Sequence, residues 1–574
     1  MALFVALIVA TATTGAACGP PRTSTPSENA AANAGIPRGG NLLVSVRAEP
    51  RSFNRLAARD STTELLTSLT QAKLVRINKV TQEVEPWLAE SWTRSDDGRR
   101  YTLKLGPDAV FSDGQPFTSA DVVFTFKAVY DEKTGSNLAD SLQANGKKLQ
   151  VTALDPHTVE IAFAEPFAAG VRLLDNLPIL PRHKLAAALE AGRLGDGWGL
   201  STPPSEVVGL GPFVLAEYVP GQRLVFNQNP RYFRRAPDGG RLPYLDRVTV
   251  EIVPDQNAEM LRLEAGQIDM TQNEIAPESY APLKRAADAG QVKLVDLGVG
   301  LNPNSLWFNL KPGAFAGDPR AAWLQRDELR QAISLAVDRQ LFADTVYLGA
   351  AAPVYGPITP ANKKWNWEGL PKTPHDPEAA KAKLAAIGLV DRNGDGLVED
   401  ARDRPARFTL MTQKCRPELE RACAVIRDEM KNIGVVVDVV ALEVSALIDR
   451  FANSGRYEAV YFNAFATDTD PAINPDFWFS FGSAHLWNMA QKTPATDWER
   501  RIDELMAKQI AAPDERERKR LFDEVQQVFV EHVPVVYFAA PRVLIAVSSR
   551  VSNLMPAVSR PQTLWAPDTI AVNK

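Results

Sequence analysis

The sequence VEPWLAESWTRSDDGRRYTLKLGPDAVFSDGQPFTSADVVFTF, residues Val84–Phe126, is the most informative stretch of this chain. Two runs of alternating apolar and polar residues predict short strands, and the polar Asp96-Asp97-Gly98 between them predicts a turn. Ser119–Asp121 then has the residue types that begin a helix.

Length and composition set the class of protein. The chain has 574 residues, which is more than one hydrophobic core supports, so we expect two or three packed lobes. The apolar fraction of 45% and the charged fraction of 23% are ordinary for a globular protein. The net charge of -5 is spread without large blocks, which argues against nucleic acid as a partner.

The N-terminus has the pattern of an export signal. Ala2–Ala10 is almost wholly apolar, and small residues then lead to Cys18, so residues 1–17 are predicted to be a signal peptide. Residues 18–40 are rich in Pro, Ser, Thr, Ala, Asn and Gly and are predicted to form a flexible tether. Beyond this region no apolar run approaches the roughly 20 residues that span a bilayer.

Further blocks of the same kind follow along the chain. They combine strand or helix patterns with glycine, proline or acidic residues. They are Gly209-Leu-Gly-Pro-Phe213 and Ala265-Gly-Gln-Ile-Asp269, the helix pattern Asp327–Arg339, the helix pattern Asp376–Gly388, and a tail of two amphipathic helix patterns and two strand patterns over residues 502–547.

In this order the blocks resemble the family 5 extracellular solute-binding proteins, the peptide-type receptors of bacterial ABC importers. The Val84–Phe126 block is similar to that family's P-x-L-A-E-S-W, D-D-G and F-x-D-G-x-P-x-T-A-x-D-V segments. The resemblance extends with gaps over most of residues 41–550. Gly15-Ala16-Ala17-Cys18 also resembles a lipobox, which implies a diacylated Cys18, while a plain signal peptide remains the alternative.

The resemblance implies an α/β fold of the periplasmic-binding-protein type II kind, cluster C. Two lobes and an extra inserted subdomain are expected, with the ligand cleft between the lobes. The expected division is residues 41–80, 207–300 and 540–574 for lobe I, 81–206 for the inserted subdomain, and 303–535 for lobe II.

The resemblance also implies a function. We expect the receptor component of an ABC importer, which captures oligopeptides between its lobes and delivers them to permease subunits in the membrane. It would be a monomer in the periplasm or on the outer face of the cytoplasmic membrane, held there by the lipid, and would need no cofactor. The alternatives are the same role for a sugar, nickel chelate or haem, a secreted hydrolase, and a periplasmic chaperone.

Signatures of catalysis and of metal binding are missing from the sequence. It contains no H-E-x-x-H, G-x-S-x-G or Walker lysine loop, and its five histidines form no i, i+4 pair. Asp391-Arg-Asn393-Gly-Asp395-Gly396 matches the first half of a calcium loop, but Arg402 replaces the glutamate of the twelfth position. We therefore predict a polar turn there and assign no metal site, with cation binding as the minor alternative.

The richest binding pattern lies in residues 457–488, where aromatic residues stand beside acids. In the resembling family a strand here ends in W-x-x-D-x-x-D-P, and the first Asp pairs with the terminal ammonium of a peptide. Asp468 corresponds to that residue and Phe465 to the Trp, although the shorter spacing to Pro471 leaves Asp470 as a competitor.

The remaining candidate ligand contacts are Trp487 on the same side, and Glu49 and Tyr355 on the opposite wall. The alternative that the aromatic residues are core and that both acids cap a turn stays open.

Two cysteines remain once Cys18 is assigned to lipid. In an oxidising compartment Cys415 and Cys423 could bridge the start of a helix to its second turn, and two reduced or buried thiols are the alternative. With no histidine nearby, they lack the spacing of a zinc site.

Overall fold

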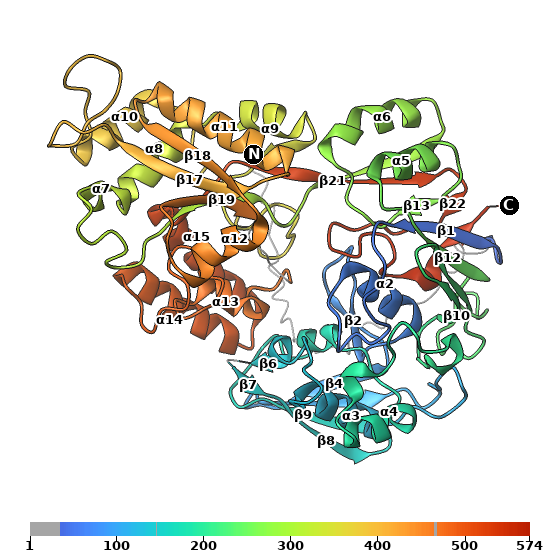
Figure 1. Cartoon of the computed structure of the whole chain (residues 1–574). Coiled ribbons are helices and arrows are strands. Elements are labelled where there is room, and N and C mark those ends of the chain that lie inside the picture. The colour runs from blue at the N-terminus through green and yellow to red at the C-terminus, as the bar shows by residue number, and fades with distance from the viewer. Residues whose placement is uncertain (1–34, 145, 464–467, 574) are drawn as a thin grey trace, which may run out of the picture.

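The computed structural model of the chain describes residues 35–144, 146–463 and 468–573. Figure 1 shows three parts: a lobe that carries β1, a lobe that carries β17 to β19, and a smaller part that carries β4, β8 and β9. We call them lobe I, lobe II and the inserted subdomain. The mixture of strands and helices in each part confirms the predicted α/β class.

In the described part of the chain, eight strands form the lobe I sheet, in the order β10-β11-β12-β1-β13-β21-β14 with β16 beside β21. The central β1 is parallel to β12 and β13, and it buries Leu42, Val44 and Val46 in the core. The strands are β1 (Asn41–Val46), β10 (Phe213–Val219), β11 (Arg223–Gln228), β12 (Arg247–Ile252), β13 (Met270–Thr271), β14 (Val292–Val299), β16 (Ala351–Pro353) and β21 (Ala539–Ser548). Helices α2 (Ser61–Thr70), α5 (Gln256–Glu264) and α6 (Tyr280–Asp288) belong to the same lobe.

The inserted subdomain contains the two strands and the helix predicted within Val84–Phe126. The predicted strands are β4 (Ala89–Arg94) and β5 (Arg100–Leu105), paired antiparallel. The predicted helix is α3 (Ser119–Tyr130), where Thr118 and Asp121 form a capping box that satisfies free N–H groups of the first turn. The sheet has the order β4-β5-β9-β8 and is completed by β8 (Gln150–Asp155) and β9 (Thr158–Ala162), with α4 (Arg182–Glu190) beside α3.

Lobe II is built on a sheet of order β18-β17-β19-β15-β20. The helices predicted at Asp327–Arg339 and Asp376–Gly388 are observed as α8 and α10, and the two predicted tail helices as α14 and α15. The strands are β15 (Asn304–Phe308), β17 (Arg407–Gln413), β18 (Val436–Leu442), β19 (Ala459–Asn463) and β20 (Val535–Tyr537). The helices are α7 (Ala321–Leu324), α8 (Asp327–Ala336), α9 (Arg339–Tyr347), α10 (Pro377–Ala386), α11 (Pro417–Asn432), α12 (Val444–Ile448), α13 (Pro475–Trp478), α14 (Asp497–Ala511) and α15 (Glu515–His532).

Two segments connect the lobes side by side. One runs from β14 to β15 through Gly300, and the other runs from β20 into β21, the long strand that crosses between the lobes in Figure 1. The backbone N–H of Gly300 donates to the carbonyl of Pro541 at 2.8 Å, and the Thr359 hydroxyl donates to the carbonyl of Gly300 at 2.7 Å. The crossing segments are therefore bonded to each other and to lobe II.

None of the helices in the described residues has the length and apolar character that a membrane span needs.

Candidate functional site

The carboxyl ends of parallel strands mark the edge of an α/β sheet where ligands bind. In lobe II, β17 is parallel to both β18 and β19, so Gln413, Leu442 and Asn463 end at the same edge. In lobe I, β1 is parallel to β12 and β13, so Val46, Ile252 and Thr271 end at one edge. Each lobe thus presents one carboxyl edge.

The crossing segment places the two carboxyl edges against each other. Strand β14 is parallel to β13, because both are antiparallel to β21, and β14 therefore ends at the lobe I edge. Strand β15 is antiparallel to β19 and begins with Asn304 opposite Asn463, so it starts at the lobe II edge. Only residues 300–303 separate the two strands, and both edges consequently meet where the chain crosses.

Glu49, a predicted contact, lies at the lobe I edge just beyond β1. Its carboxylate accepts hydrogen bonds from the Tyr218 hydroxyl at 3.1 Å and from the backbone N–H of Gly221 in the β10–β11 turn. Burial and the adjacent carboxylate raise the pKa of Tyr218 above its ordinary value, so the phenol keeps its proton and donates. The Glu49 turn is therefore fixed to its neighbouring hairpin.

A buried acid that sequence reasoning missed organises the same edge. Glu259 is fully buried and accepts hydrogen bonds from Ser45, Thr271 and Asn273 at 2.6, 2.6 and 2.8 Å. It also accepts from Nε of Arg47 at 2.9 Å, which holds that guanidinium at the end of β1. The available signal was the polar Ser45 and Thr271 inside otherwise apolar strands, since buried polar groups need partners.

Asp468 lies on the lobe II side and is bonded to the inserted subdomain. Its Oδ1 atom accepts from Nε of Arg172 at 2.6 Å and from the backbone N–H of Asp470 at 2.8 Å. The Arg172 guanidinium also donates to the Gln82 carbonyl at 2.7 Å and to the Thr469 hydroxyl at 2.8 Å. Sequence reasoning missed Arg172, because nothing local identifies an arginine that pairs with an acid 296 residues away.

The carboxylate of Asp470 forms an ion pair with a second buried arginine. Its two carboxylate oxygens accept from Arg518 of α15 at 3.0 and 2.6 Å, and both side chains are 7% exposed. One of these oxygens also accepts from the backbone N–H of Ala472 and so begins the turn that follows. The alternative left open from the sequence, that these acids serve a turn, describes Asp470 well.

Trp487 is part of the lobe II core. It is 1% exposed, its ring packs against Phe477, Trp498 and Phe529, and its Nε1–H donates to Glu499 at 3.0 Å. Because its ring is buried among other aromatic rings and its polar atom is hydrogen-bonded, we assign it a structural role instead of the predicted ligand contact.

Tyr355 lies beside the crossing strands. The guanidinium of Arg339 is 5.0 Å from its ring centre, and Val354 donates to the carbonyl of Phe538 at 3.0 Å. Burial lowers the pKa of Arg339 to about 10. In the described residues no hydrogen bond or ring contact joins Tyr355, Glu49 and Asp468, while Phe465 and Cys18 lie outside the described residues.

The disulfide considered between Cys415 and Cys423 is not formed in the described part of the chain. Both cysteines are free, because Cys415 is exposed in the turn before α11 and Cys423 is buried on the core face of that helix. Burial raises the pKa of Cys423 to about 12, so this thiol stays protonated and inert. The alternative of two separate thiols therefore describes the structure.

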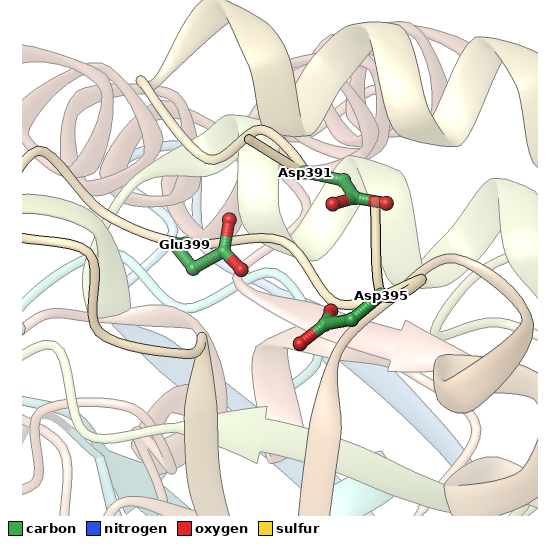
Figure 2. Close-up of side chains that lie close together, drawn as sticks. All are labelled: Asp391, Asp395 and Glu399. Atoms are coloured by element: carbon green, nitrogen blue, oxygen red, sulfur yellow. The ribbon is translucent and has the colours of Figure 1, made fainter. Parts of the chain in front are cut away.

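The acidic turn after α10 brings three carboxylates together. Figure 2 shows Asp391, Asp395 and Glu399 converging, and one carboxylate oxygen of each lies within 4.8 Å of the other two. Asp391 accepts from the backbone N–H groups of Gly394 and Gly396, so the acids also close the predicted polar turn. The twelfth position, which supplies a bidentate glutamate in a complete calcium loop, is Arg402.

A family model and several known proteins are similar to this chain over most of its length. The family model "Bacterial extracellular solute-binding proteins, family 5 Middle" matches residues 83–485. A probable ABC transporter-binding protein of Deinococcus radiodurans is 28% identical and covers 88% of each chain. The oligopeptide-binding protein AppA of Bacillus subtilis is 27% identical over 90% of this chain and 89% of its own.

Solved structures show the same fold. The substrate-binding protein CtaP of Listeria monocytogenes superposes with a TM-score of 0.75 at 23% identity, covering 94% of this chain and all of its own. The Bacillus subtilis AppA structure in complex with a nonapeptide gives a TM-score of 0.69 at 24% identity, over 94% of this chain. These neighbours confirm the predicted fold class.

Proposed function

This chain belongs to the bacterial extracellular solute-binding proteins of family 5, and we propose that it is the oligopeptide-capturing receptor of an ABC importer. Proteins of this family are binding components of transporters and not enzymes. The cargo, the lipid anchor at Cys18, the monomeric state and the delivery to a membrane permease are parts of the proposal.

The observation that carries the proposal is the opposition of two carboxyl edges joined by short crossing segments. Because only residues 300–303 connect β14 to β15, small backbone changes there can swing one lobe against the other. A ligand that touches both edges binds the closed form more tightly than the open form and therefore shifts the population toward closure. Capture and closure are then one event.

Peptide is the cargo that the relatives favour. Three of the relatives whose names state a cargo are oligopeptide-binding proteins, of Bacillus subtilis, Escherichia coli and Salmonella typhimurium, and they match 90%, 80% and 82% of this chain. A peptide main chain offers alternating donors and acceptors that strand ends can pair with, whatever the side chains are. Others are named haem-binding and alpha-galactoside-binding proteins, so the choice of cargo needs a direct test.

A thermal-shift screen distinguishes these cargoes. We expect di- to pentapeptide pools to raise the melting temperature by several degrees, because a ligand that binds only the folded state stabilises it by mass action. Sugars, nickel chelates and haem, together with the constituent free amino acids at matched concentration, serve as comparisons and are expected to give no shift. A shift with sugars or chelates alone would reject peptide as the cargo and keep the receptor function.

A further inference from the structure

The loop that carries Asp468 and Asp470 is already neutralised by the protein. Each acid is paired with one arginine, Arg172 for Asp468 and Arg518 for Asp470, and the N···O contacts are 2.6 Å in both pairs. The side chains of Arg172 and Asp468 are 9% and 12% exposed, so this pair lies largely out of water. Two buried positive charges therefore balance two buried negative charges.

Hydrogen bonds fix the Arg172 guanidinium in this site. Its three guanidinium nitrogens each donate to a different acceptor: the Asp468 carboxylate, the Gln82 carbonyl and the Thr469 hydroxyl. Burial alone would lower the pKa of Arg172, but the Asp468 carboxylate reverses this and raises it, so the guanidinium stays charged. Because all three of its nitrogens are hydrogen-bonded, the charged guanidinium is held beside the Asp468 carboxylate.

The pair also joins two parts of the molecule. Arg172 follows β9 of the inserted subdomain, Gln82 lies in the turn just before that subdomain's first strand, and Asp468 follows β19 of lobe II. Around them the Gln82 side chain donates to the Ala361 carbonyl at 2.7 Å and accepts from the Lys363 backbone N–H at 3.1 Å. The Asp468 loop is thus one side of a contact between the subdomain and lobe II.

A cationic ligand group would be unfavourable at this position. An ammonium that approached Asp468 would add a surplus positive charge to a balanced buried cluster, or would displace Arg172 and leave its guanidinium buried without a carboxylate. Removing one partner of a buried ion pair is strongly destabilising, because the remaining charge has lost its hydration. The binding free energy of a terminal ammonium at Asp468 would therefore be unfavourable.

We infer that Arg172, and not the amino terminus of the cargo, neutralises Asp468 in this protein, so that peptides with a blocked amino terminus bind as well as free ones. The inference rests on the proposed peptide-receptor function and makes Arg172 a residue that determines specificity. It also replaces the ammonium-reading role that the sequence resemblance implies for Asp468.

Calorimetric titration of the full-length protein tests this with one pentapeptide from the screen and its N-acetylated twin. We expect the two dissociation constants to agree within about threefold for the unmodified protein. In Arg172→Gln the carboxylate is freed, and the free-amine peptide should bind about tenfold more tightly than the acetylated one. Lys364→Gln is the matched control, because Lys364 pairs with Glu83 across the same contact, and with Glu515, without touching Asp468. A tenfold loss on acetylation in the unmodified protein overturns the inference.

A second measurement works even if no peptide binds, which would reject the proposed function instead. Melting temperatures of Arg172→Gln, Asp468→Asn and the double variant form a double-mutant cycle. Because each single change leaves one buried partner unsatisfied, we expect the double variant to lose no more than the worse single variant. Additive losses would show that the two side chains are not coupled and would overturn the inference. An Arg172→Gln protein that fails to fold, beside a double variant that folds, supports the pairing.

Discussion

Replacing Glu499 by alanine is expected to lower the free energy of unfolding by about 3–5 kcal/mol, one of the two largest effects that this structure predicts. Glu499 is 2% exposed, and its carboxylate accepts from His485 at 3.2 Å and from Trp487 and Gln491 at 3.0 Å each. It also forms the capping box that begins α14 with Thr496. Alanine removes the acceptor of several buried donors at once.

The same residue makes stability depend on pH. Burial alone would raise the pKa of Glu499, but hydrogen bonds from His485, Gln491 and Trp487 outweigh it and lower the pKa from 4.5 to about 2. A carboxyl group whose folded pKa is depressed stabilises the fold above its unfolded pKa and loses that contribution as the pH falls. At 1.36 kcal/mol per unit, about 3 kcal/mol is lost between pH 4.5 and 2.

Urea denaturation at pH 7, 4.5 and 3 measures both effects. Asp497→Ala is the matched control, because this acid lies in the same first turn with its side chain 92% exposed and is expected to change stability by less than about 0.5 kcal/mol. A Glu499→Ala protein as stable as the control at pH 7, or one that keeps the full acid sensitivity of the unmodified protein, would contradict the assignment.

Asp470→Ala is the second large expected effect, again a loss of about 3–5 kcal/mol in the free energy of unfolding. The substitution leaves the guanidinium of Arg518 buried without its carboxylate, and it removes the acceptor for the Ala472 N–H. The remaining contacts of Arg518 are the Gln509 carbonyl and the ring of Trp365, which do not replace a negative charge.

Denaturation of this variant is compared with Asp476→Ala, an exposed acid in the following helix that should cost less than about 0.5 kcal/mol. The double variant Asp470→Ala with Arg518→Met is expected to recover part of the loss, since no buried charge then remains unpaired. If Asp470→Ala kept full stability and only weakened peptide binding, Asp470 would be a ligand contact and the structural role would be wrong.

The sequence could predict those features that depend on local pattern. The strand–turn–strand–helix order of Val84–Phe126 was readable because alternation, turn residues and a capping box are all encoded within a few positions. The amphipathic tail helices were readable for the same reason, although α14 begins at Asp497 and not near Ile502, because the capping box at Thr496 extends it.

The site was less predictable, because it depends on partners distant in sequence. Asp468 and Asp470 looked like free acids on a loop, and only folding brings Arg172 and Arg518 to them. Trp487 looked like a binding platform for the same reason: its contacts with Phe529 and Glu499 cannot be read from the aromatic-rich stretch itself. Residue type indicated the chemistry, and tertiary contacts determined which groups already interact with other side chains of the protein.

The central claim is that the two opposed carboxyl edges bind one peptide. Hydrogen exchange measured by mass spectrometry, with and without a pentapeptide from the screen, tests it most directly. We expect slower exchange in the segments that follow β1 and β13 in lobe I, residues 47–50 and 272–274, and β17 and β18 in lobe II, residues 414–416 and 443–444. Binding that leaves both edges unprotected, or that protects only surfaces remote from the crossing segments, would contradict the account.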